Sequence, residues 1–265
     1  MKTLIRYLKV YRTILRLNLV QLFTYRVNLI NSIIGHTVWA AFIIISMLLL
    51  TSRTSSVFGW TRNELLILAG TYNIILSIFY FLFSRNFNEF SNTIHYGKLD
   101  ALITKPIDIQ FLMTCMYVSY THVIRFILGV GFVIFILNQM HMVFTIVTFL
   151  WFILFLVLSI VILYSIWLLV MTITIWHTKL SNLADLLYEG HSVSKYPQEI
   201  FKGASWPVYF ILFPLTLIVT IPTKVLLQKM LLGDIFWPII FAIGLFGISR
   251  RFWKFALRYY TSASG

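Results

Sequence analysis

Long apolar segments separated by short polar ones make up most of the chain. Apolar runs lie at about residues 27–50, 63–84, 109–137, 143–166 and 235–248. A helix needs roughly 20 apolar residues to cross the hydrocarbon core of a bilayer. These runs therefore predict membrane-spanning helices.

One further apolar segment is ambiguous. Residues 206–227 are apolar enough to form the fifth span, but they contain Pro207, Pro214 and Pro222. Proline removes a backbone hydrogen bond and bends a helix, so three prolines fit a re-entrant element better than a plain span. The pattern as a whole predicts an all-α fold: a polytopic integral membrane protein with six transmembrane helices.

The first 22 residues have the pattern of an amphipathic helix. Basic residues recur three and four positions apart, at Lys2, Arg6, Lys9, Arg12 and Arg16. Apolar residues occupy a different face, at Leu4, Leu8, Tyr11, Leu15, Leu19 and Leu22. Such a helix is expected to lie in the headgroup plane, with its basic side toward anionic membrane lipids. The alternative is a solvated N-terminal tail.

The composition supports a membrane protein. Of the 265 residues, 60% are hydrophobic and 11% are charged, whereas soluble domains average about a quarter charged. The mean hydropathy is +0.88. A net charge of +13 would suggest nucleic acid in a soluble protein. Here the basic residues gather at the ends of apolar runs, so they are expected to set orientation in the membrane, and no nucleic-acid partner is expected.

The distribution of Lys and Arg predicts that both termini are cytoplasmic. With 206–227 as the fifth span, 16 of the 21 basic residues fall on the side of the termini and four on the other. With 177–195 as the fifth span, the numbers become 14 and six. Cytoplasmic segments carry the excess of basic residues, so both arrangements give the same orientation.

Motifs of enzymes are absent from the sequence. It has no G-x-x-x-x-G-K-[ST] phosphate loop, no G-x-S-x-G elbow and no H-E-x-x-H pair. The six histidines are scattered without metal-ligand spacing, and the single cysteine, Cys115, cannot form an internal disulfide. We therefore expect no catalytic residue, no metal site and no cofactor bound by the chain itself.

A polar stretch at residues 85–108 follows the second span. Its apolar residues have helical spacing, at Phe87, Phe90, Ile94 and Tyr96, and Gly97 can end the helix. A short amphipathic helix on the cytoplasmic side is suited to a groove on a partner protein, with Glu89 as a charged contact. The alternative is a helix that lies on the membrane surface.

Arg125 lies about midway along the predicted third span. A charge at that depth is unfavourable unless it is paired or faces a cavity. Asp185 and Glu189 are one helical turn apart and so share a face, and they are the predicted partners of Arg125 if 177–195 crosses the membrane. The alternatives are an arginine that snorkels to the surface and a solvated cytoplasmic helix that carries the two acids.

The order of these features resembles the ABC-2 type permeases, in particular a poorly characterised six-helix branch of that family. The resemblance is carried by G-K-L-D-A-L-I-T-K-P-I at Gly97–Ile107, Y-P at Tyr196–Pro197, I-P at Ile221–Pro222 and R-Y-Y-T-S-A-S-G at Arg258–Gly265. It covers residues 1–265 as a single transmembrane domain.

The resemblance implies a permease subunit of an ATP-driven exporter in the cell membrane, as in the plasma membrane of a bacterium. Two permeases, as a homodimer or with a related second permease, would form the pathway. Separate ATPase subunits would bind ATP and Mg and contact the coupling loop at 85–108. The resemblance also places the fifth span at 177–195 and makes 196–233 a re-entrant outer segment.

Two other functions compete with this interpretation. An ion-gradient-driven secondary transporter would use Arg125 and Asp185 in an ion-coupling path and would need no ATPase. A membrane-embedded transferase would need clustered acids, histidines or a nucleophile at the membrane edge, and the sequence pattern shows none.

Overall fold

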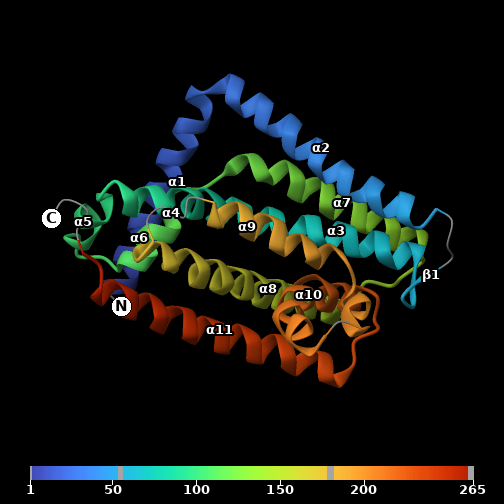
Figure 1. Ribbon diagram of the computed structural model, residues 1–265. Coiled ribbons are helices and arrows are strands. Elements are labelled where there is room, and N and C mark those ends of the chain that lie inside the picture. The colour runs from blue at the N-terminus through green and yellow to red at the C-terminus, as the bar shows by residue number, and fades with distance from the viewer. Residues whose placement is uncertain (1, 53–55, 178–181, 204, 262–265) are drawn as a thin grey trace.

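The computed structural model describes residues 2–52, 56–177, 182–203 and 205–261, which are mainly helical (Figure 1). The α-helices are α1 (Lys2–Thr24), α2 (Arg26–Leu50), α3 (Arg62–Phe79), α4 (Arg85–His95), α5 (Lys98–Ile103), α6 (Ile109–Cys115), α7 (Val123–Gln139), α8 (Ile146–Thr172), α9 (Leu183–Gly190), α10 (Trp206–Leu226) and α11 (Leu232–Arg258). Strands β1 (Ser56–Val57) and β2 (Trp60–Thr61) form an antiparallel hairpin.

Among the described residues, six helical segments are long and apolar enough to cross a membrane, which confirms the predicted all-α fold with six candidate spans. They are Arg26–Leu50, Arg62–His95, Tyr120–Gln139, Ile146–Ile175, Trp206–Leu226 and Leu232–Arg258. α1, α4, α5, α6 and the C-terminal end of α11 gather at one end of the molecule, and the β1–β2 hairpin lies at the opposite end (Figure 1). We call these the α4 end and the hairpin end.

The second span is the centre of the packing. α3 continues through a π-helical segment, Tyr80–Ser84, into α4. α3 is buried along nearly its whole length because α2, α7, α8 and α10 all pack against it. Glycines allow the closest approach: a Cβ on Gly70 would lie 2.5 Å from Cγ2 of Val133, and a Cβ on Gly129 would lie 3.2 Å from the carbonyl oxygen of Gly70. Small residues at such contacts let helices pack backbone to backbone.

The third span differs from the prediction, which placed one helix over residues 109–137. α6 ends at Cys115, and α7 begins only at Val123. The irregular backbone between them is satisfied by side chains from other elements. Asn86 donates to the carbonyl of Tyr117 at 2.7 Å and accepts from its N–H at 2.8 Å, and Asn18 donates to the carbonyl of Met116 at 3.1 Å. Non-helical backbone inside a membrane protein needs such partners, and hydropathy does not reveal them.

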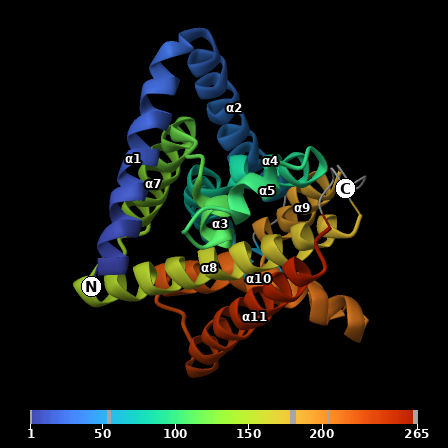
Figure 2. The same cartoon turned by 90° about the vertical axis from the view of Figure 1, so that its left-hand side faces the viewer.

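The N-terminal segment forms a helix, as predicted for residues 1–22. α1 and α2 form the two arms of a V (Figure 2). α1 is tied to the α6–α7 region, since the Tyr7 hydroxyl accepts from the Asp108 N–H at 2.9 Å and the Tyr120 hydroxyl donates to the Leu15 carbonyl at 3.0 Å. Tyr11, Leu15 and Leu22 of the predicted apolar face are partly buried, whereas Leu8 and Leu19 are exposed. The position of α1 in a headgroup plane remains a prediction.

The chain between α8 and α10 runs from the α4 end of the molecule toward the hairpin end. Near its start, the Trp176 ring packs 5.5 Å from Phe252, close to the C-terminal end of α11. Near its end, the Glu199 carboxylate accepts a 3.0 Å hydrogen bond from Nε1 of Trp60 in the hairpin. Residues 178–181 of the predicted 177–195 span lie outside the described residues. The remainder forms α9 and then a 3₁₀ segment, His191–Lys195.

Both ends of α10 lie toward the hairpin end. The helix begins at Trp206, shortly after a 3₁₀ segment, Gln198–Gly203, that contacts the hairpin through Glu199. Near its C-terminal end, Lys224 forms a 3.3 Å ion pair with Glu199. Just beyond it, Lys229 bonds to Glu64 at the start of α3 at 2.6 Å.

Candidate functional site

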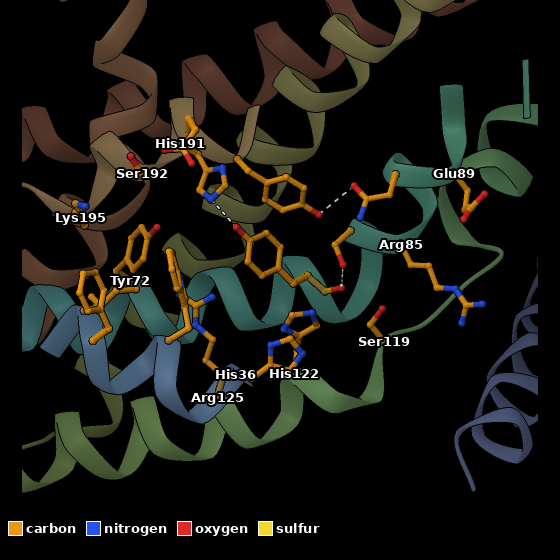
Figure 3. Close-up of a pocket in the computed structure, with 18 residues that line it drawn as sticks. His36, Tyr72, Arg85, Glu89, Ser119, His122, Arg125, His191, Ser192 and Lys195 are labelled. Atoms are coloured by element: carbon orange, nitrogen blue, oxygen red, sulfur yellow. Dashed lines mark hydrogen bonds between the residues drawn. The ribbon is translucent and has the colours of Figure 1, made fainter. Parts of the chain in front are cut away.

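A cavity of about 670 Å³ lies among α2, α3, the start of α7, and α9 with the 3₁₀ segment that follows it. Its polar walls include His36, Tyr72, Arg85, Glu89, Ser119, His122, Arg125, His191, Ser192 and Lys195 (Figure 3). The gap between α6 and α7 brings Ser119 and His122 to the wall, and the π-helical segment begins there with Tyr80. π-Helical turns inside α-helices are frequent at functional sites.

Arg125 is the most deeply buried charge in this cavity, with 2% of its surface exposed. Its Nε donates to Oδ1 of Asn73 at 2.8 Å. Its guanidinium carbon lies 5.7 Å from the ring centroid of Tyr72 and 5.6 Å from that of Tyr80, within the range of cation–π attraction. Asn73 is eleven residues beyond the first residue of α3, or about 16 Å along the helix, which is about half the 30 Å thickness of a hydrocarbon layer.

The predicted ion pair of Arg125 with Asp185 or Glu189 is wrong. Both acids are exposed on α9, and neither bonds to Arg125 in the part of the chain that the structure describes. α9 turns the opposite face, with Ala184 and Leu187, into the protein. Glu189 borders the cavity, but neutral groups make the contacts with the guanidinium.

Three histidines that are scattered in the sequence meet in this cavity. The rings of His36 and His122 stack with centroids 3.9 Å apart, and Nε2 of His36 is 3.1 Å from Oγ1 of Thr121. Nδ1 of His191 is 2.5 Å from the Leu187 carbonyl, which can only accept, so Nε2 of a neutral His191 accepts from the Tyr80 hydroxyl at 2.6 Å. Sequence spacing gave no sign of this cluster. Among the described residues, no group of His, Cys, Asp and Glu could hold a metal ion.

The predicted docking residues of α4 are divided between the core and the surface. Phe87 and Phe90 have no exposed surface and Ile94 is 1% exposed. The Phe87 ring packs 5.4 Å from Trp167, and the Phe90 ring packs 5.5 Å from Trp253. These three residues therefore face the protein's own core, and the prediction that they anchor a partner is wrong. Glu89 is partly buried and borders the cavity.

An exposed tip remains at the turn between α4 and α5. Gly97 has a φ of 65°, in the left-handed region that favours glycine, and it turns the chain from one helix into the next. Tyr96, immediately before it, is 67% exposed, and Ile103 at the end of α5 is 44% exposed. Asn92, His95 and Lys98 are also exposed, so the tip combines two large apolar side chains with polar ones.

An ion pair joins the far end of this loop to α11. Arg250 forms a bidentate contact with Asp108 and also bonds to Oε1 of Gln110. Asp108 caps α6 as well, by accepting from the Phe111 N–H at 3.1 Å. The hydrogen bond from Arg250 is the main reason that the pKa of Asp108 is lowered. The sequence did not reveal this pair, because its members lie 142 positions apart.

Residues 37–264 match a family model described as "ABC-2 family transporter protein". No curated protein and no solved structure matches the chain.

Proposed function

Because the chain belongs to the ABC-2 family of transporter proteins, a family of multi-pass membrane transport components, we propose that it is the permease subunit of an ATP-driven exporter. Two permeases, as a homodimer or with a related second permease, would form the pathway. ATP and Mg would be bound by separate ATPase subunits, because the chain has no phosphate loop. Membrane lipids would surround the dimer in the plasma membrane of a bacterium.

The exposed tip between the second and third spans carries this proposal. Tyr96 and Ile103 are large exposed side chains on a surface that also carries Asn92, His95 and Lys98, and binding energy at an interface concentrates in a few such anchors. The tip, instead of the buried face of α4, is the proposed contact with the ATPase.

A mechanical path connects this tip with the cavity. The helical run Arg62–His95 is continuous, so a force applied at Tyr96 acts along α4 on the π-helical segment and on Tyr80, which lines the cavity. The Arg250–Asp108 pair ties the same loop to α11. Closure of the ATPases would thus move the cavity wall and α11 together.

We also propose that the termini are cytoplasmic and that the chain between α8 and α10 makes the fifth crossing. The contacts of Trp176 near the C-terminal end of α11 and of Glu199 with the hairpin support this. α10 would then be part of the re-entrant outer segment at 196–233, in agreement with its ion pairs at the hairpin end. Labelling of Ser205→Cys in a Cys115→Ala background tests the topology: reaction only from the outside supports it, and reaction only from the cytoplasm contradicts it.

The histidine cluster favours one alternative, a transporter driven by an ion gradient, because histidines buried in membrane proteins serve in proton relays. Uptake or export that follows an imposed proton gradient, without any ATPase, would support this alternative. A requirement for ATP and for a partner ATPase would exclude it.

Co-purification with an ATPase encoded beside the chain tests the main proposal. The wild-type chain should retain the ATPase, and a Tyr96→Ala/Ile103→Ala variant should lose most of it. Leu231→Ala is the matched control, since Leu231 is 69% exposed next to α11 and lies at the hairpin end. Equal retention by the double variant would contradict the docking proposal.

A further inference from the structure

Two buried nitrogen atoms in the cavity have no hydrogen-bond partner in the described part of the chain. Nη2 of Arg125 and Nδ1 of His122 make no hydrogen bond to any described residue. His122 ends the 3₁₀ turn that leads directly into α7, and Arg125 follows three positions later, so the two side chains share a face, and both line the cavity. Leaving a buried guanidinium donor unsatisfied is unfavourable, so Nη2 of Arg125 marks a position where a bound molecule would supply an acceptor.

The charge of the cavity favours an anion at this position. Its walls carry the cations Arg85, Arg125 and Lys195 against the carboxylates Glu89 and Glu189. No described carboxylate touches Arg125, whose Nε is occupied by the neutral amide of Asn73. A guanidinium presents donors in a planar fork that matches phosphate and carboxylate oxygens.

The edge of the same cavity is apolar. Trp39 and Phe42 of α2 line it, and each is 56% exposed, in contrast to the 2% exposure of Arg125. α2 is one of the least buried candidate spans, so these rings lie on a surface that faces lipid or another subunit. The cavity therefore combines a buried cation with an exposed aromatic rim, which is complementary to an amphiphile.

We infer that this cavity binds the oxyanion headgroup, phosphate or carboxylate, of an amphiphilic molecule, with Arg125 as the principal donor and the apolar chain against Trp39 and Phe42. The inference rests on the proposed function, because it names the chemical class that the transporter would carry. Arg125 would recognise the headgroup with Nη2 while Asn73 holds Nε in place.

Calorimetric titration of the full-length chain in maltoside micelles tests this with four probes: hexyl phosphate, hexyl glucoside, hexyltrimethylammonium and inorganic phosphate. Hexyl phosphate should bind at least about tenfold more tightly than the neutral and cationic probes, as expected for a charge-assisted hydrogen bond. It should also bind more tightly than inorganic phosphate, because the free ion makes no contact with the rim. Equal binding of the three hexyl probes would overturn the inference, and equal binding of both phosphates would overturn its amphiphile part.

Variants assign the binding to Arg125. Arg125→Gln should weaken hexyl phosphate binding by about 10- to 100-fold and leave hexyl glucoside within about twofold, and Arg125→Lys should restore part of the loss. Arg251→Gln, an exposed arginine of α11, is the control and should bind as the wild type does. If Arg125→Gln does not fold, Trp39→Ala provides the test, because it should weaken hexyl phosphate binding and leave inorganic phosphate unchanged. Full affinity in a folded Arg125→Gln, or in Trp39→Ala, would contradict the assignment.

The binding assay contains no ATPase, so its outcome does not depend on whether the proposed function is correct. A chain that retains its ATPase but does not prefer hexyl phosphate would refute the anion site and leave the permease proposal standing. A chain that binds hexyl phosphate through Arg125 but never associates with an ATPase would support the site and refute the ATP-driven exporter.

Discussion

Replacing Phe90 by Ala is expected to destabilise the protein instead of only uncoupling it from a partner. The Phe90 side chain has no exposed surface. Its ring lies 5.5 Å from Trp253 of α11 and 6.3 Å from Phe87, so the substitution leaves a cavity between α4 and α11. Buried Phe→Ala substitutions cost about 3–5 kcal/mol, as the sum of lost contacts and the residual cavity.

The matched control is Tyr96→Ala, six positions along the chain. Tyr96 is 67% exposed, and substitutions at exposed positions usually change stability by less than about 0.5 kcal/mol. The two variants therefore separate a core role from a surface role within one loop. The sequence alone had assigned both residues to the same docking face.

The assay is the midpoint of thermal unfolding in maltoside micelles, followed by size-exclusion chromatography of each variant. Phe90→Ala should lower the midpoint clearly, whereas Tyr96→Ala should match the wild type. A Phe90→Ala variant that is as stable as the wild type but no longer retains its ATPase would refute the core assignment and restore Phe90 as a docking residue.

Three further predictions concern the packing and the charged loop. Asn86→Ala leaves two backbone groups of Tyr117 unpaired and should cost about 1–3 kcal/mol for each buried group, measured as a lower unfolding midpoint. Gly129→Ala should cost about 1–3 kcal/mol because its Cβ would meet the carbonyl oxygen of Gly70 at 3.2 Å. Gly131→Ala, with nothing within 4 Å of its Cβ, should be neutral or stabilising in the same assay. Equal effects of the two variants would contradict the close approach of α3 and α7. The lowered pKa of Asp108 predicts a contribution to stability that is fully present above the pKa of an unfolded Asp, about 3.9. This contribution is lost as the pH falls through the lower pKa of the folded state. The unfolding midpoint should therefore stay constant from pH 8 to 5, and Asp108→Asn should lack the acid-dependent part of the decline.

Hydropathy predicted the helices that face the membrane but not the places where the chain leaves regular structure. The boundaries of α2 and the existence of α8 and α11 follow from apolar length. The break between α6 and α7 depends on Asn86 and Asn18, whose side chains reach Tyr117 and Met116 from other elements. No local sequence pattern shows that backbone hydrogen bonds are made by a distant side chain. The sequence therefore predicts a third span that is too long.

The candidate site was predictable only in part, for a related reason. A charge inside an apolar run marked Arg125 as important, but its contacts with Asn73, Tyr72 and Tyr80 come from another helix. The apolar spacing in α4 correctly indicated an amphipathic helix. It did not indicate whether the apolar face contacts a partner or the protein's own α8 and α11. In the structure that face packs in the protein's own core.

ATP hydrolysis by the reconstituted complex tests the central claim most directly. The chain and an ATPase encoded beside it would be assembled in lipid nanodiscs, and hydrolysis would be measured for the wild type, for Tyr96→Ala/Ile103→Ala and for the Leu231→Ala control. We predict that the chain alone hydrolyses no ATP, that the wild type and the control alter the activity of the ATPase equally, and that the double variant leaves it at the level of the free ATPase. Hydrolysis by the isolated chain, or an ATPase whose activity is the same with and without the wild-type chain, would contradict the account.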